Sequence, residues 1–131
     1  MDLEVTSGTI ATLLEEATLE HPRECCGLLL GECGVVLEAR PCANIHPQPE
    51  SHFEIDPQAL IAAHRAQRAG ALQVLGYYHS HPNGRAEPSA EDRAQASGDG
   101  RIWAIVAGGA VSWWRDAPER FEPLPTRLAA G

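Results

Sequence analysis

The sequence predicts an α+β fold, with a mixed and mostly antiparallel sheet of about six or seven strands flanked by three helices. Two apolar runs, at 25–30 and 101–107, carry this prediction, because they lack a polar face, as strands buried on both sides of a sheet do. Each run is followed by a short turn and a second strand, at 35–39 and 110–115. We therefore expect two antiparallel hairpins.

Helix signals occur over 7–21, 57–69 and 89–97. In the first segment apolar residues recur at i, i+3, i+4 and i+7, and Ser7 is placed as the N-cap. The second segment follows Asp-Pro, an N-cap with proline at the first helical position. The third follows Pro-Ser, which also suits a helix start.

Strands at 3–6, 51–55 and 72–81 bring the predicted count to seven. The proline-rich stretch after about 118 has room for one further edge strand near 121–124, and its last three residues are expected to fray. No linker is long enough to separate domains. We therefore predict a single domain over 1–131, with a tail that is extended or frayed.

Composition and charge exclude several classes of partner. The formal net charge is −8 and the pI is about 5.1, which argues against binding to nucleic acid or to an anionic membrane, because both require positive charge. No apolar run approaches the ~20 residues that span a bilayer, and the acidic N-terminus has no basic start typical of a signal peptide. The sequence therefore predicts a cytoplasmic protein.

The four cysteines fit the same location. They are Cys25, Cys26, Cys33 and Cys42, and none forms a Cys-x-x-Cys pair. Without a secretory signal we interpret them as reduced thiols. Adjacent cysteines are also poor partners in a tetrahedral site, which disfavours a structural zinc site made of cysteines.

His79 and His81 close the apolar strand at 72–81. Residues i and i+2 of a strand project from the same face, so both imidazoles can reach one point. Asp92, at the start of the helix at 89–97, can add a carboxylate. Two nitrogens and one oxygen, with a fourth position open, form the ligand set of a catalytic zinc site.

Each of these residues also has a simpler interpretation. Two histidines can pack in a core, although burial without a metal leaves several ring nitrogens unsatisfied. Ser89 and Asp92 resemble a capping box, and that role is compatible with metal binding. Glu24 at the entrance of a strand is, by itself, an exposed acid. Spacing alone leaves these alternatives open.

The pattern as a whole resembles the His-x-His-Pro-x6-Ser-x2-Asp signature of the JAMM (MPN+) metalloproteases. Its invariant positions are occupied by His79, His81, Pro82, Ser89 and Asp92. Upstream, 24–31 resembles the Glu-x-Cys-Gly segment of that family, and Asn44 with 52–57 looks like its linking segment. The resemblance covers roughly 1–115 and implies the MPN fold, which is similar to that of cytidine deaminases.

The resemblance implies a role for each site residue. His79, His81 and Asp92 would bind Zn2+. Glu24 would accept a proton from a water molecule and deliver it to the leaving amine, and Ser89 would donate a hydrogen bond to the oxyanion. The implied reaction is hydrolysis of an amide, peptide or isopeptide bond without a covalent enzyme intermediate.

The implied substrate is a ubiquitin-like or sulfur-carrier protein, cleaved after its C-terminal Gly-Gly. The chain resembles the compact prokaryotic type, since neither the loop after His81 nor the 97–101 connection has room for ubiquitin-gripping insertions. A small-molecule amidohydrolase and a non-catalytic MPN scaffold are the alternatives. A zinc deaminase fits poorly, because its His-x-Glu and Pro-Cys-x-x-Cys patterns are absent. The sequence leaves the carrier and the oligomeric state open.

Overall fold

The computed structural model describes residues 2–129. Its helices are α1 (Ser7–Glu20), α2 (Pro57–Arg68) and α3 (Ala90–Gln95). Its strands are β1 (Leu3–Val5), β2 (Cys26–Glu32), β3 (Val35–Cys42), β4 (Gln73–Ser80), β5 (Ile102–Ala107), β6 (Ala110–Asp116), β7 (Phe121–Pro123) and β8 (Thr126–Leu128). All eight strands form one sheet in the order β7-β6-β5-β4-β2-β3-β1-β8.

The sheet is mixed, as predicted. Four neighbouring pairs are antiparallel (β2–β3, β2–β4, β5–β6, β6–β7) and three are parallel (β1–β3, β1–β8, β4–β5). Both predicted hairpins are confirmed, with Cys33-Gly34 and Gly108-Gly109 at their turns. The further edge strand that the sequence allowed near 121–124 is present as β7. Strand β8 was not anticipated, because it has three residues and depends on pairing with the distant β1.

Two local predictions were wrong. Residues 51–55 form no strand and leave only an isolated bridge between Asn44 and Ile55. The Asn44 side chain replaces a partner strand there: its amide donates to the His52 carbonyl and its oxygen accepts from the Glu54 N–H. The N-cap of α1 is Thr6 rather than Ser7, since the Thr6 hydroxyl accepts from the Thr9 N–H at 3.2 Å.

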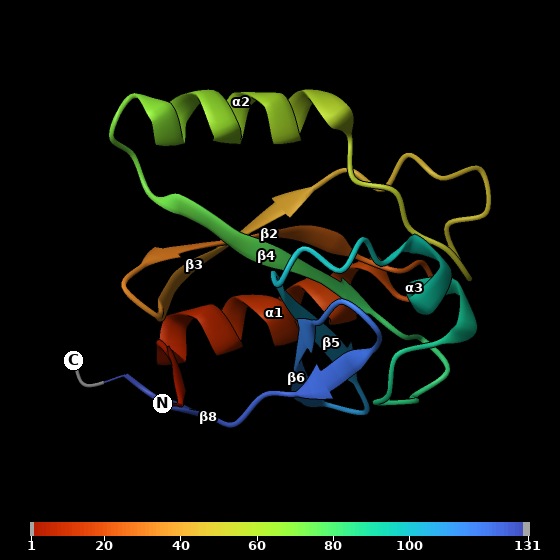
Figure 1. Cartoon of the computed structure of the whole chain (residues 1–131). Helices are drawn as coiled ribbons and strands as arrows, with labels where there is room; N and C mark the ends of the chain where they lie inside the picture. Colours follow the sequence, from red (N-terminus) through yellow and green to blue (C-terminus); the bar gives the residue numbers. More distant parts are fainter. Residues whose placement is uncertain (1, 130–131) are drawn as a thin grey trace.

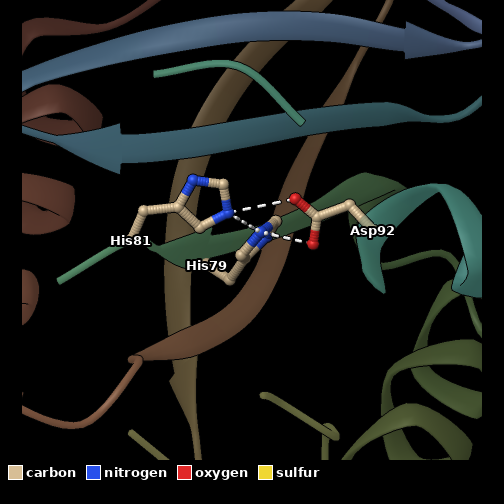
Figure 2. Close-up of side chains that lie close together, drawn as sticks. All are labelled: His79, His81 and Asp92. Atoms are coloured by element: carbon tan, nitrogen blue, oxygen red, sulfur yellow. Dashed lines mark hydrogen bonds and ion pairs between the residues drawn. The ribbon is translucent and has the colours of Figure 1, made fainter. Parts of the chain in front are cut away.

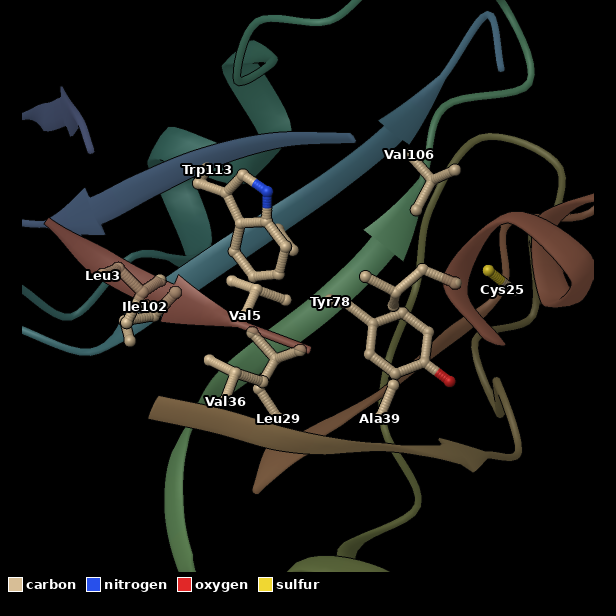
Figure 3. Close-up of a cluster of buried hydrophobic side chains, with 12 residues drawn as sticks. Leu3, Val5, Cys25, Leu29, Val36, Ala39, Tyr78, Ile102, Val106 and Trp113 are labelled. Carbon is tan, nitrogen blue, oxygen red and sulfur yellow. The ribbon is translucent and has the colours of Figure 1, made fainter. Parts of the chain in front are cut away.

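The helices cover opposite faces of the sheet, α1 on one and α2 on the other (Figure 1). Figure 3 shows the core on the α1 face, where Tyr78 and Trp113 pack among aliphatic side chains. The core on the α2 face contains Phe53, Ala63 and Trp103. Strand β2 contributes to both cores: Leu29 packs on the α1 face, and Leu28 and Leu30 pack on the α2 face. Each fully buried leucine contributes roughly 1.5–3 kcal/mol.

Strand β4 lies at the centre of the sheet, between β2 and β5. Gly76 permits its close approach to β5, because a Cβ at this position would collide with the Ile102 carbonyl oxygen. The carboxyl end of β4 points toward α3 (Figure 1). Within residues 2–129, no helix is long and apolar enough to cross a membrane.

Tail residues 121–128 contribute β7 and β8 to opposite edges of the sheet. Ala129 also donates a backbone hydrogen bond to Val5 at 2.9 Å. The rest of the frayed end that we predicted, residues 130–131, lies outside the described residues. The described part of the tail is therefore tied to the sheet.

Candidate metal centre

Three side chains that the sequence singled out meet at the carboxyl end of β4. His79 is fully buried and His81 is 7% exposed, and Asp92 reaches them from α3 (Figure 2). The Nε2 atoms of the two histidines are 3.0 Å apart. Each Nε2 is also 3.0 Å from one carboxylate oxygen of Asp92. Two nitrogens and two oxygens therefore surround one point.

The start of α3 holds Asp92 in place through a capping box. The Ser89 hydroxyl accepts from the Asp92 N–H at 3.0 Å, and Asp92 Oδ2 accepts from the Ser89 N–H at 2.9 Å. The predicted cap is confirmed, and the same carboxylate contacts both histidines. Because the Ser89 oxygen acts as acceptor in the cap, its own proton is available for a further hydrogen bond.

Charge at this point is determined by burial and hydrogen bonding. Burial raises the pKa of Asp92, but hydrogen bonds from His79 and His81 outweigh it and hold the pKa below its usual range, so the carboxyl is ionised. Burial lowers the pKa of His79, which therefore stays neutral. A carboxylate and a neutral imidazole are the forms in which these side chains bind metals.

The loop after β4 sets the tautomer of His81. Its Nδ1 lies 2.7 Å from the Arg85 carbonyl oxygen, which can only accept, so Nδ1 carries a proton. The Asn83 side-chain oxygen accepts from the Arg85 N–H at 2.9 Å and so supports that carbonyl. Burial lowers the pKa of His81, but its bonds to Asp92 and Arg85 outweigh it and leave the pKa raised.

The donor set fits a transition metal. With Nδ1 protonated, Nε2 of His81 can donate to Asp92 only in the imidazolium form, which the raised pKa of His81 favours. In the neutral form the Nε2 lone pair faces the carboxylate, and both can bind a cation between them. Two imidazoles and one carboxylate suit Zn2+ with an open fourth position. Within residues 2–129, these side chains form the only group of three or more His, Cys, Asp or Glu residues close enough to share an ion.

Glu24 lies just before β2 and faces the same space. Together with His81 and Ser89 it lines a cavity of about 860 Å3. Burial raises the pKa of Glu24 to about 7; His81 opposes this and Asp92 adds to it. Its backbone is held at both ends, because its N–H donates to Pro49 at 2.7 Å and its carbonyl accepts from the Asn44 amide at 3.0 Å. A carboxyl group of this kind can exchange a proton near neutral pH.

The structure brings together all five predicted site residues and adds others that sequence reasoning missed. Phe53 stacks on His79, and the indole of Trp103 meets the same imidazole edge-on. Asn44 makes four hydrogen bonds around Glu24 and residues 46–54. The ring contacts of Phe53 and Trp103 with His79 join residues far apart in the chain, so no local signal identifies them. The resemblance marked Asn44 and 52–57 only as a linking segment, without these contacts. The four cysteines are unpaired and none belongs to the cluster.

Comparison with known families matches residues 6–116 to the model of prokaryotic homologs of the JAB domain. A desampylase of Haloferax volcanii is 34% identical over 95 residues, covering 71% of this chain and 68% of the relative. A probable TtuB-protein conjugate cleaving protease of Thermus thermophilus is 41% identical over 88 residues. That alignment covers 67% of this chain and 56% of the Thermus protein.

A comparison with solved structures agrees with this family match in fold. The structure of JAMM, described as a metalloprotease-like zinc site in the proteasome and signalosome, matches with a TM-score of 0.59. The match covers 97% of this chain and 99% of that one, at 21% sequence identity. The predicted fold class is thereby confirmed.

Proposed function

The chain belongs to the family of prokaryotic homologs of the JAB domain, and we propose that it is a zinc-dependent peptidase or isopeptidase. Its proposed substrate is a ubiquitin-like or sulfur-carrier protein, cut just after the C-terminal Gly-Gly. One observation carries the proposal: Glu24 and Ser89 line the same cavity as His81, which belongs to the histidine–aspartate cluster. The relatives from Haloferax and Thermus, a desampylase and a probable protein-conjugate cleaving protease, support it.

In this proposal His79, His81 and Asp92 hold the zinc ion. When bound, the ion supplies Lewis acidity, which polarises the scissile carbonyl and lowers the pKa of a water molecule. His79 is neutral and Asp92 is ionised in the structure, and His81 would bind the ion in its neutral form. Together with Zn2+ these ligands would leave one net positive charge at the site. The capping box keeps the carboxylate oriented while it binds.

Glu24 is the proposed general base and acid. Its pKa of about 7 lets it accept a proton from water and release it to the leaving amine within one turnover. Hydrogen bonds to Pro49 and Asn44 fix its backbone at the position from which the residue lines the cavity. Proton transfer by a positioned side chain contributes roughly 10²–10⁴-fold to rate.

Ser89 is the proposed oxyanion donor. Its oxygen accepts from the Asp92 N–H, which orients the hydroxyl and leaves its proton available for the developing negative charge. The side chain lines the cavity that Glu24 also faces. Base and donor therefore approach a bound amide from one cavity.

The Gly-Gly specificity, the domain organisation and the cellular location of the protein are also proposals. An extended Gly-Gly segment can enter where bulkier side chains would clash, and its backbone can pair with an edge of the sheet. We further propose a single domain over 1–131 and a cytoplasmic location. The four unpaired cysteines support that location, because disulfides are rare in the cytosol.

The test is cleavage of a ubiquitin-like carrier extended by a short peptide beyond its Gly-Gly. We expect chelator-sensitive release of the peptide and about one zinc per chain. Glu24→Gln should keep zinc and lose roughly 10²–10⁴-fold in turnover. Glu50→Gln is the matched control, because Glu50 lines the same cavity but is exposed, and both zinc content and turnover should be unchanged.

Three results would contradict parts of the proposal. Intact extended carrier in the presence of zinc-loaded protein would rule out the substrate. Hydrolysis of small amides alone would favour the amidohydrolase. A purified protein without stoichiometric zinc and without activity would indicate a scaffold.

A further inference from the structure

The two histidines of the cluster differ in the hydrogen bonding of their Nδ1 atoms. His81 donates from Nδ1 to a backbone carbonyl. The Nδ1 of His79 is buried, and among the described residues it has no hydrogen-bond partner. Metal-binding histidines are usually oriented by a hydrogen bond at the second nitrogen. A different interaction must therefore hold the ring of His79.

Phe53 provides this interaction. Its ring lies against the imidazole of His79, with the centroids 4.3 Å apart and the planes inclined by 15°. Trp103 meets the imidazole edge-on, at 5.7 Å and 90°. Phe53 and Trp103 also pack against each other, with centroids 6.0 Å apart. The imidazole cannot turn about its Cβ–Cγ bond without displacing one of these rings.

Phe53 is itself firmly placed. It is 6% exposed and belongs to the core on the α2 face. Its carbonyl accepts from the Gln95 side chain of α3, the helix that carries Asp92, at 3.4 Å. The preceding and following residues are held by Asn44, through His52 at 3.0 Å and Glu54 at 3.1 Å. The ring of Phe53 is thus tied to the same framework as the aspartate.

We infer that Phe53 is a positioning residue for the metal centre. Its ring fixes the plane of His79 so that Nε2 faces His81 and Asp92, taking the part that a hydrogen bond plays for His81. This inference rests on the proposed zinc site. It assigns a role to the side chain of Phe53, which the proposed chemistry itself does not use.

The decisive variants keep the apolar volume of Phe53 and remove its flat face: Phe53→Leu and Phe53→Met. Zinc affinity is measured by competition with a chromophoric chelator, and ligand geometry by the visible spectrum of the Co2+-substituted protein. We expect a rise of about tenfold in the zinc Kd, as for the loss of other ligand-orienting partners, with altered Co2+ bands. Phe53→Tyr retains the ring and should therefore keep both the zinc Kd and the Co2+ spectrum of the parent protein.

Phe121→Leu is the matched control. Phe121 is partly buried, packs against the same core and contacts the same Trp103, with centroids 4.9 Å apart. Among the described residues it makes no ring contact with His79. Its zinc Kd should stay within about twofold of the parent value. Unfolding of each metal-free variant in chelator separates metal affinity from general stability.

Two outcomes would overturn the inference: Phe53→Met with unchanged zinc Kd and unchanged Co2+ spectrum, or Phe53→Tyr impaired as strongly as Phe53→Leu. If Phe53→Leu does not fold, Phe53→Met decides alone. Failure of this inference is distinct from failure of the proposed function. In the first case the parent protein binds zinc and the variants bind it equally, whereas in the second the parent protein binds none.

Discussion

The two histidines at the end of β4 are two residues apart, yet different interactions hold their rings. His79 is fully buried, contacts the rings of Phe53 and Trp103, and has a pKa lowered by burial. His81 borders the open cavity, donates a hydrogen bond to Arg85 and has a raised pKa. One side of the centre is therefore an aromatic wall and the other a polar, solvent-reachable side.

The two sides of the centre therefore have different properties: one restricts the motion of a side chain, and the other can exchange protons. The aromatic wall restricts a ligand by packing, which needs no water and leaves no room for a substrate. The polar side carries the cavity, the acid Glu24 and the hydroxyl of Ser89, where protons can be exchanged. A metal centre of this design has a fixed half and a reactive half. Substitutions on the two sides should consequently differ in what they damage.

The largest contrast is expected between His79→Ala and His81→Ala. Both should weaken zinc binding by more than about 100-fold, because each removes a proposed ligand. In chelator, His79→Ala should also lower the free energy of unfolding by about 2–3 kcal/mol, since it opens a cavity inside the aromatic wall. His81→Ala should lower it by less than about 1 kcal/mol, because the residue borders a cavity already open. Urea unfolding of the metal-free proteins measures both free energies of unfolding. Equal losses of stability in the two variants would contradict the difference between the aromatic and the polar side.

An intermediate effect is expected at Glu24, in the opposite direction. Its folded-state pKa of about 7 lies above the ordinary 4.5, so the folded protein favours the protonated form. The resulting stabilisation is present below pH 4.5 and is lost as the pH rises through 7. At pH 8 the metal-free Glu24→Gln protein should therefore be more stable than the parent, by about 1–3 kcal/mol.

The pH dependence supplies the control for Glu24→Gln. Near pH 4 the gain should vanish, because the parent carboxyl is then protonated in both folded and unfolded chains. Glu50→Gln should show no such pH-dependent gain, since Glu50 is exposed. Denaturant unfolding at both pH values in chelator measures the difference. A metal-free Glu24→Gln protein that is less stable than the parent at pH 8 would contradict the burial of an acid at this position.

The smallest effect is expected from Asn83→Ala. This change removes the oxygen that supports the Arg85 N–H and thereby loosens the carbonyl that orients His81. We expect the zinc Kd to rise about threefold, with the free energy of unfolding within about 1 kcal/mol of the parent. Asn83→Asp keeps the acceptor and should keep the affinity within about twofold. If Asn83→Asp weakens zinc binding as much as Asn83→Ala does, loss of the side-chain acceptor does not explain the weaker binding.

Sequence and structure agree most closely where one element supplies all the information. The capping box at Ser89, the hairpin turns and the helix start at Asp56 depend on neighbouring residues, and each lies where it was predicted. The strand predicted at 51–55 was wrong because Asn44, several residues upstream, takes over its backbone hydrogen bonds. The short strand β8 was missed because β1, at the other end of the chain, completes its pairing.

The sequence by itself predicted that His79, His81 and Asp92 meet, and the structure brings them together. Strand periodicity places His79 and His81 on one face, and the first turn of α3 directs Asp92 outward from its cap. Only the tertiary structure decided which residues surround them. The sheet order places β5, with Trp103, beside β4, and the segment after β3 carries Phe53 onto His79. Local spacing follows from backbone geometry, whereas a packing partner depends on long-range burial that no single stretch of sequence encodes.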